Sequence, residues 1–339
     1  MKRYKINLLL LIGMVIFVLA GPSAFARRNV KISTIGATPP QLENSQTLQQ
    51  KVERMINFLH RQLHQVLPDQ PDLILLPEAC DRPAGLSLKE QFEYFKVRGN
   101  QVQDFLASVA GEHRCYIAFG VKRQDESGAW RNSCVLLDRA GKVAGIYNKN
   151  FPTMPEMEGG IVAGNETPIF HTDFGTIGCA ICFDLNFDEL RARYASLKPD
   201  IILFPSMYHG GLAQANWAYS CRSYFVGSIG VAKLPSEIRN PMGRVVATTT
   251  NYFNFITATV NLDYELAHLD GNWGKLRALK NKYGPEVTIY DPGKIGPVMI
   301  ISESDSVSAQ DMVKEFDIEL LDHYFDRSRA FRLRKGNMK

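Results

Sequence analysis

The chain has 339 residues, of which 45% are hydrophobic and 10% aromatic, and its formal net charge at pH 7 is +4. A chain of this length can bury a large core, and no shift in composition divides it, so one folded domain is the simplest prediction. A small disulfide scaffold is excluded, because six cysteines in 339 residues are too sparse to hold a chain together.

The first 26 residues have the pattern of a secretory signal peptide. Three basic residues precede an apolar run over residues 6–20, and Ala24 and Ala26 provide the small residues of a cleavage site. The run is shorter than the roughly 20 residues that span a bilayer as a helix, so an uncleaved anchor is the weaker alternative. We expect cleavage after Ala26 and a mature protein, residues 27–339, that is periplasmic or secreted.

Cleavage would remove three positive charges, leaving a formal net charge of +1. Basic residues cluster only in the C-terminal tail, at Arg327, Arg329, Arg332, Arg334 and Lys335. A solvated terminal segment is favoured here over a polyanion site, so no nucleic-acid partner is expected.

Periodicity along the chain predicts alternating strands and helices. The predicted strands are residues 30–35, 73–76, 115–122, 133–138, 143–147, 201–204 and 227–231, together with an apolar strand that leads to Cys182. The predicted helices are residues 42–66, 101–110, 187–196, 213–224 and 311–325. Asn186 and Glu189 have the spacing of a capping box at the start of the third helix. This order predicts an α/β fold with helices on the faces of the sheets.

The most informative segment is residues 177–184, with the sequence IGCAICFD. An apolar strand ends there in the thiol of Cys182, and the acidic residue Asp184 follows at once. The pattern is typical of a nucleophile held on a sharp turn between a strand and a loop. A thiol needs nearby groups that favour the thiolate and exchange protons.

Two other strand ends carry suitable groups. Leu76-Pro77-Glu78 places a carboxylate after one apolar strand, and Tyr147-Asn148-Lys149 places an ammonium after another. A carboxylate in this setting is expected to point into the cleft where α/β proteins bind ligands. If both charges are buried, their pairing recovers part of the free energy of desolvation.

Glu78, Lys149 and Cys182, in this order, resemble the catalytic residues of the nitrilase superfamily of carbon–nitrogen hydrolases. The resemblance extends from about residue 30 to about residue 260. Further matching positions are Pro205, Ser206, Trp217, Arg222 and residues 240–244. It implies a four-layer α-β-β-α sandwich, a C-terminal arm from about residue 264 and a homodimer or higher homo-oligomer.

The resemblance also implies the roles of the residues. Cys182 would be the nucleophile, Glu78 the general base, and Lys149, aided by the backbone N–H of Phe183, the group that stabilises the oxyanion. A second carboxylate follows the lysine in this family. Glu156 and Glu158 both qualify, with Glu156 favoured. Asp184, Ser206, Tyr208 and Trp217 are supporting or substrate-positioning candidates, and Tyr116 and His209 are further candidates for the pocket wall.

Two other patterns suggest different chemistry. Cys179 and Cys182 form a C-x-x-C pair, but residues three apart in a strand face opposite sides, so a redox pair is disfavoured. His60 and His64 have a spacing compatible with a metal, but no third ligand accompanies them, so a solvated helix face is favoured. We expect neither a metal nor a cofactor.

The sequence therefore predicts an exported thiol hydrolase that cleaves an amide or N-carbamoyl bond, or a nitrile, through a covalent cysteine intermediate. An amidase is preferred over a true nitrilase. The alternatives are an acyltransferase that hands the same thioester to an amine, and a binding protein that keeps the fold without turnover.

Overall fold

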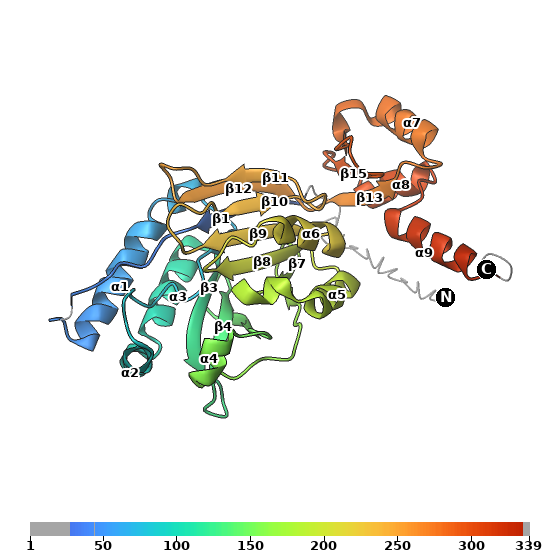
Figure 1. Ribbon diagram of the computed structural model, residues 1–339. Coiled ribbons are helices and arrows are strands. Elements are labelled where there is room, and N and C mark those ends of the chain that lie inside the picture. Colours follow the sequence, from blue (N-terminus) through green and yellow to red (C-terminus); the bar gives the residue numbers. More distant parts are fainter. Residues whose placement is uncertain (1–27, 44, 335–339) are drawn as a thin grey trace, which may run out of the picture.

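The computed structural model describes residues 28–43 and 45–334 of the chain (Figure 1). The predicted signal peptide, residues 1–26, lies outside the described residues. Within them, no helix is long and apolar enough to cross a membrane.

Two six-stranded sheets form the centre of the molecule. The first has the order β12 (Phe255–Asn261), β1 (Asn29–Ile35), β2 (Leu73–Leu75), β3 (Tyr116–Gln124), β4 (Trp130–Leu137) and β5 (Val143–Asn148). The second has the order β11 (Val245–Thr248), β10 (Glu237–Arg239), β9 (Tyr224–Ile229), β8 (Ile201–Ser206), β7 (Thr176–Cys179) and β6 (Phe170–His171).

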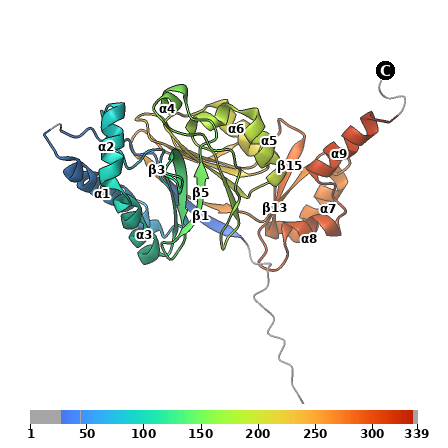
Figure 2. The same ribbon diagram turned by 90° about the horizontal axis from the view of Figure 1, so that it is seen from below.

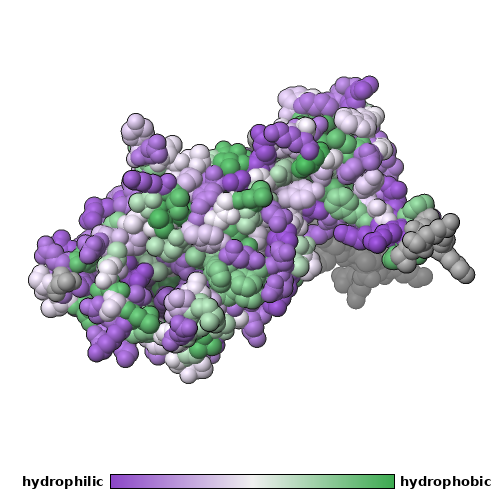
Figure 3. All heavy atoms as spheres, viewed as in Figure 1, coloured by the Kyte–Doolittle hydropathy of each residue, from purple (hydrophilic) through white to green (hydrophobic). Residues whose placement is uncertain are grey.

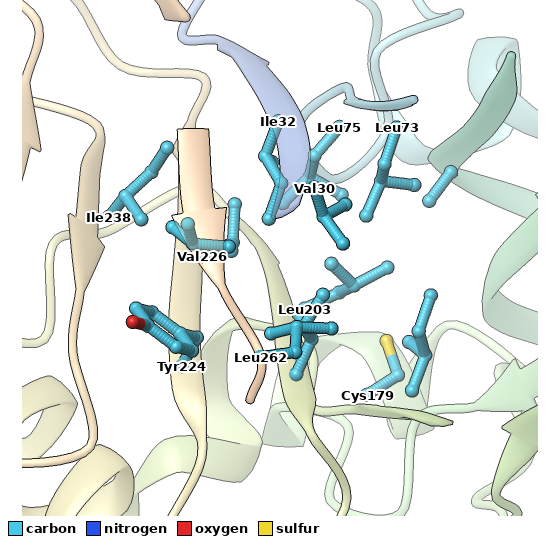
Figure 4. Packing of buried hydrophobic residues seen from close by; sticks show 14 of the residues in the cluster. Val30, Ile32, Leu73, Leu75, Cys179, Leu203, Tyr224, Val226, Ile238 and Leu262 are labelled. Atoms are coloured by element: carbon cyan, nitrogen blue, oxygen red, sulfur yellow. The ribbon is translucent and has the colours of Figure 1, made fainter. Parts of the chain in front are cut away.

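The inner faces of the two sheets pack against each other. Figure 4 shows Ile32 and Leu75 of the first sheet near Leu203 and Val226 of the second. All four side chains are fully buried or nearly so. The alternation of inward and outward residues along each strand therefore produces one apolar layer between the sheets.

Helices cover both outer faces, as Figure 2 shows from below. On the first sheet lie α1 (Leu48–Leu63) and α3 (Gln101–His113), with α2 (Leu88–Arg98) packed on α1. On the second lie α5 (Asp188–Leu197) and α6 (Leu212–Cys221). The predicted α-β-β-α sandwich is confirmed.

Two helix starts differ from the prediction. The helix expected from residue 42 begins at Leu48, because the Thr47 side chain accepts a hydrogen bond from the Gln50 backbone N–H and caps it. The prediction of a capping box formed by Asn186 is wrong, because α5 starts at Asp188 without a side-chain cap. The Asn186 amide instead donates to the Phe183 carbonyl and the Tyr208 hydroxyl, across the loop that follows Cys182.

The segment from residue 264, expected as an arm, folds into a small module. It contains a three-stranded sheet in the order β13 (Tyr264–His268), β15 (Pro297–Ser302) and β14 (Val287–Tyr290), with α7 (Trp273–Tyr283), α8 (Ala309–Glu315) and α9 (Leu321–Arg332). The helix predicted over 311–325 is two helices, interrupted at Asp317, whose φ is +49°.

The module and the carboxyl ends of the parallel strands lie at opposite ends of the sandwich. Asp322 of the module pairs with Lys198 and Arg222, which lie three residues before β8 and two residues before β9. The far end, where β2, β7, β8 and β9 finish, is therefore left for the predicted catalytic residues. The face of the molecule in Figure 3 is mixed, with apolar side chains scattered among hydrophilic ones.

Candidate active site

Glu78 lies three residues beyond the end of β2, where its backbone passes very close to Gly120 of β3. A Cβ on Gly120 would lie 2.4 Å from the Cα of Glu78. Hydrogen bonds from Gly120 N–H to the Pro77 carbonyl and from Cys80 N–H to the Gly120 carbonyl fix this approach. Only glycine fits at position 120, and it brings the buried Glu78 carboxylate over the end of the sheet.

Lys149 follows the last residue of β5 and is 1% exposed. Its Nζ lies 2.8 Å from Glu78 Oε1 and 3.0 Å from Glu156 Oε2. Burial alone would lower the pKa of Lys149, but the two carboxylates outweigh burial and raise it. The lysine is therefore a fixed cation between two carboxylates.

Glu156 is the second carboxylate that the structure brings to this site. It belongs to α4 (Met154–Glu158), and its Oε2 also accepts a hydrogen bond from the Thr153 backbone N–H at 2.9 Å. Lys122 Nζ lies 3.3 Å from Glu156 Oε1. Burial raises the pKa of Glu156, but Lys149 and Lys122 outweigh burial and hold it at about 2. Glu158 is exposed on the same helix.

Asn132 of β4 also contacts both carboxylates, and sequence reasoning missed it. Its amide Nδ2 lies 2.7 Å from Glu78 Oε1 and 2.8 Å from Glu156 Oε1. Its backbone carbonyl accepts a hydrogen bond from the Lys149 N–H at 2.8 Å, which extends the pairing of β4 with β5. The register of the predicted hairpin, counted back from its turn, could have placed Asn132 beside Lys149.

Cys182 lies three residues past the end of β7, at the first position of a 3₁₀ helix (Cys182–Asn186). Its φ of +49° is in the left-handed region, which non-glycine residues seldom adopt and which marks functional turns. The thiol lies beside the Glu78 side chain and the Met207 backbone. The sharp turn predicted here thus directs the thiol toward the carboxylate of β2.

The electrostatics of the site keep the resting thiol protonated. Burial and the negative charge of Glu78 raise the pKa of Cys182 to about 12, against the opposing effect of Lys149. A protonated thiol needs a base before it can act as a nucleophile, and the Glu78 carboxylate beside it is in position to act as one.

Asp184 is fully buried and holds the loops around the thiol together. It accepts hydrogen bonds from the Tyr147 hydroxyl at 2.7 Å and from the backbone N–H groups of Ile181 and Phe151 at 2.8 and 2.7 Å. Burial raises the pKa of Asp184 to about 6, although these donors oppose the rise. Asp184 ties the loop after β5 to the loop after β7, behind the reacting groups.

Phe183 and Tyr208 are partly accessible beside the thiol. The Phe183 ring is exposed and packs edge-on against Phe187, with ring centroids 5.3 Å apart. Burial, and then the nearby charge of Cys182, raise the pKa of Tyr208 to about 12. Ser206 is buried: its hydroxyl donates to the Tyr208 carbonyl and accepts from the Tyr208 N–H, so it shapes this loop.

Three other aromatic candidates make contacts of their own. Trp217 is buried under the second sheet, where its Nε1–H donates to the Leu185 carbonyl at 2.9 Å. Tyr116 is buried in the layer between the sheets, at the start of β3 and so away from the site. His209 lies 3.3 Å from Glu237, beyond the loop that carries Tyr208. Trp217 therefore supports the turn after Cys182 through its core packing.

The two other residue pairs considered in the sequence, Cys179 with Cys182 and His60 with His64, have the following surroundings. Cys179 is buried between the sheets, hydrogen-bonded to Cys134, and both Cys179 and Cys182 are free thiols. His60 and His64 contact each other on α1, with 3.2 Å between their Nε2 atoms. Among residues 28–43 and 45–334, no three His, Cys, Asp or Glu side chains are grouped so that they could hold a metal ion.

The two glutamates of α4 give a direct comparison. We expect Glu156→Gln to lower turnover by about 100-fold or more, because it removes one of the two charges that hold Lys149. Glu158→Gln should stay within about twofold of the wild type, since a neutral side chain replaces an exposed carboxylate. Steady-state kinetics on both variants measure the difference. A severe loss in Glu158→Gln alone would reverse the assignment.

Comparison with known proteins identifies the family of the chain. Residues 31–265 match the carbon-nitrogen hydrolase family. The human protein Omega-amidase NIT2 is 22% identical over 254 residues, which cover 71% of this chain and 90% of that protein. A hydrolase of Schizosaccharomyces pombe is 21% identical over 213 residues, which cover 56% of this chain and 66% of that protein.

Solved structures show the same fold. Nit3 of Saccharomyces cerevisiae, a member of branch 10 of the nitrilase superfamily, has a TM-score of 0.58 at 18% identity and covers 69% of this chain and 90% of its own. An amidase from Nesterenkonia sp. has a TM-score of 0.56 at 14% identity, with 69% and 91% covered. The match of the family over more than two thirds of the sequence is the decisive finding. The chain belongs to the carbon-nitrogen hydrolase family, within the nitrilase superfamily that its motifs predict.

Proposed function

We propose that this carbon–nitrogen hydrolase is an amidase that cleaves a small amide or N-carbamoyl compound through a thioester on Cys182. The observation that carries the proposal is the contact of the Cys182 thiol with Glu78, whose Oε1 is in turn 2.8 Å from Lys149 Nζ. The contact supplies a nucleophile, a base and a cation in one buried cluster, which is what acyl transfer requires.

In the first half of the proposed reaction, the thiol attacks the amide carbon while its proton passes to Glu78. The oxyanion that forms is stabilised by the Lys149 ammonium and by the backbone N–H of Phe183. Glu78 then gives the proton to the departing nitrogen, the C–N bond breaks, and ammonia or an amine leaves. The product of this half is an acyl group joined to the Cys182 sulfur.

In the second half, Glu78 takes a proton from water, which attacks the thioester through a second oxyanion. The C–S bond breaks, the sulfur regains its proton, and the acid leaves: a carboxylic acid from an amide, or carbamic acid, which breaks down to carbon dioxide and ammonia, from an N-carbamoyl compound. Glu156 keeps Lys149 oriented in both halves, because its Oε2 is 3.0 Å from Nζ. The thiol stays protonated between turnovers, consistent with its raised pKa.

The proposal is tested by incubating the purified protein with panels of amides, N-carbamoyl compounds and nitriles while ammonia, amine and acid products are recorded. We expect amides to yield a carboxylic acid and a nitrogen product in equal amounts, and N-carbamoyl compounds to yield an amine, ammonia and carbon dioxide in equal amounts. Formation of a new amide with an added amine, without acid, would favour acyl transfer. Turnover of nitriles alone would contradict the amidase assignment.

We also propose that the protein is exported and that cleavage after Ala26 yields the mature chain. The support is the basic, apolar and small-residue pattern of residues 1–26. N-terminal sequencing of the native protein should begin at Arg27. An intact Met1 in the membrane fraction would contradict export.

A homodimer or higher homo-oligomer is the proposed assembly. Leu197 and Leu212 are exposed apolar side chains at the end of α5 and the start of α6, in the outer helical layer that resemblance suggests as an interface. Light scattering should give at least twice the monomer mass. A strictly monomeric mass at micromolar concentration would contradict the proposal.

A further inference from the structure

Asn132 stands out because two separate donors bridge the same two carboxylates. The Lys149 ammonium reaches Glu78 Oε1 and Glu156 Oε2, and the Asn132 amide reaches Glu78 Oε1 and Glu156 Oε1. Carboxylate oxygens only accept hydrogen bonds when ionised, so the nitrogen of the amide must face them. The orientation of the Asn132 side chain follows from its neighbours.

The amide is held there at a cost to stability. Asn132 is 1% exposed, and its Oδ1 is buried without a hydrogen-bond partner among the described residues. An unpaired buried acceptor destabilises a fold, and an apolar side chain of the same shape would avoid that penalty. A residue kept only for packing would not need an amide at this position. The hydrogen bonds that the Asn132 amide donates to the two carboxylates are therefore the reason for an amide here.

The charges of the cluster explain why an uncharged donor is suitable. Glu78 and Glu156 carry two negative charges, and Lys149 and Lys122 carry two positive charges. Asn132 faces Lys122 directly in the register of β4 with β3, so a third cation at position 132 would be crowded against the first. An amide adds a hydrogen bond to each carboxylate and leaves the charges balanced.

We infer that Asn132 is a positioning residue that fixes which oxygen of Glu78 acts as the base. Both Asn132 and Lys149 donate to Oε1 of Glu78. An oxygen that accepts two hydrogen bonds is the poorer proton acceptor, so Oε2 takes the proton from the Cys182 thiol. This inference rests on the proposed role of Glu78 and assigns the base to a single atom.

The titratable groups that face the two carboxylates come from several elements, and any pH effect must be assigned among them. They are Lys122 on β3, Lys149 after β5, Cys182 after β7, and, further out, Asp184 and Tyr208. The test therefore uses variants at position 132 that leave all of these groups in place.

The experiment measures the alkylation of Cys182 by iodoacetamide as a function of pH, read by peptide mass. The thiol suits this probe because Cys182 is partly accessible while the other five cysteines are buried. In the wild type the rate of alkylation should rise with pH at the acidic end of the pH range, as the carboxylate that receives the thiol proton becomes ionised. We call this rising part of the pH profile the acid limb. Glu78→Gln should remove that limb.

Asn132→Leu keeps the shape of the side chain and removes the donor. We expect its acid limb to move to higher pH by about 0.5 to 1 unit, which lowers the alkylation rate on the limb by about 3- to 10-fold. Asn132→Asp should shift the limb in the same direction, because it adds a third negative charge, and it carries the test alone if Asn132→Leu does not fold.

Ser133→Ala is the matched control. The Ser133 hydroxyl contacts Asn148 instead of the carboxylates, so the acid limb of this variant should not move.

An unchanged limb in the folded position-132 variants, with or without a lower rate, would overturn the inference, because a purely structural role would lower the rate equally at every pH. The readout is independent of substrate turnover. If the wild type hydrolyses no amide but the limb shifts as expected, the proposed function fails while the role of Asn132 stands.

Discussion

Cys182→Ala is expected to abolish turnover, lowering it by about three orders of magnitude or more, while the protein keeps its fold. The loss follows because the variant lacks the sulfur on which the covalent intermediate of the proposed reaction forms. Alanine at this position keeps the same backbone and removes one partly accessible sulfur, so the free energy of unfolding should change by about 1 kcal/mol at most. Product formation and urea unfolding measure the two effects.

Cys179→Ala is the matched control for that variant. It removes a sulfur from the same segment, but from the core between the sheets, where Cys179 is fully buried beside Cys134. We expect a modest loss of stability and nearly full turnover. Residual activity above about 1% in Cys182→Ala would contradict the nucleophile assignment, and loss of activity in Cys179→Ala would restore the dithiol interpretation.

Lys149→Met is expected to damage both catalysis and folding. Turnover should fall by about 100- to 1,000-fold, because the oxyanion loses its cation. The variant also leaves the carboxylates of Glu78 and Glu156 facing each other without the ammonium between them. Removing one partner of a buried ion pair costs about 3–5 kcal/mol, so the free energy of unfolding at pH 7 should fall by roughly that amount.

The loss of stability in Lys149→Met should depend on pH. The pKa of Glu156 is lowered from 4.5 to about 2, chiefly by Lys149 acting against burial. A lowered carboxyl pKa stabilises the fold above its ordinary value, and the contribution disappears as the pH falls toward 2. The difference between wild type and Lys149→Met should therefore be largest above about pH 5 and shrink in acid, as measured by urea unfolding at pH 7 and pH 3.

Lys122→Met is the matched control, because it removes the other lysine of the cluster. Lys122 contacts Glu156 at 3.3 Å and lies at the more accessible edge of the site, at 12% exposure. Lys122→Met should lower the free energy of unfolding and the rate of turnover clearly less than Lys149→Met does. Equal losses in the two variants, or a Lys149→Met protein as stable as the wild type at pH 7, would show that Lys149 is not the central cation.

Local patterns in the sequence were sufficient to predict an α/β fold with helices on the faces of the sheets, and the resemblance to the nitrilase superfamily implied the four α-β-β-α layers. The strands that lead to Glu78, Lys149 and Cys182 are short apolar runs with turn residues after them, so their ends could be placed within a few residues. The strand before Cys182 was predicted too long, since β7 ends at Cys179 and the thiol sits on the turn beyond.

Contacts between distant segments could not be predicted in this way. Asn132 and Lys122 reach the site only through the pairing of β3, β4 and β5, which depends on register. The choice between Glu156 and Glu158 depends on α4, a single helical turn in a region where the sequence predicted neither a helix nor a strand. Trp217 matched the family pattern, yet its role is burial, which sequence similarity alone does not distinguish from contact with substrate.

The measurement that tests the central claim most directly is the mass of the protein during turnover. The enzyme is mixed with excess of its best amide substrate, quenched in acid within milliseconds to seconds, and mapped by peptide mass. We predict an added mass equal to the acyl group on the peptide that contains Cys182, released by hydroxylamine and absent from Cys182→Ala. An acyl group found on another residue, or found equally in Cys182→Ala, would contradict the account.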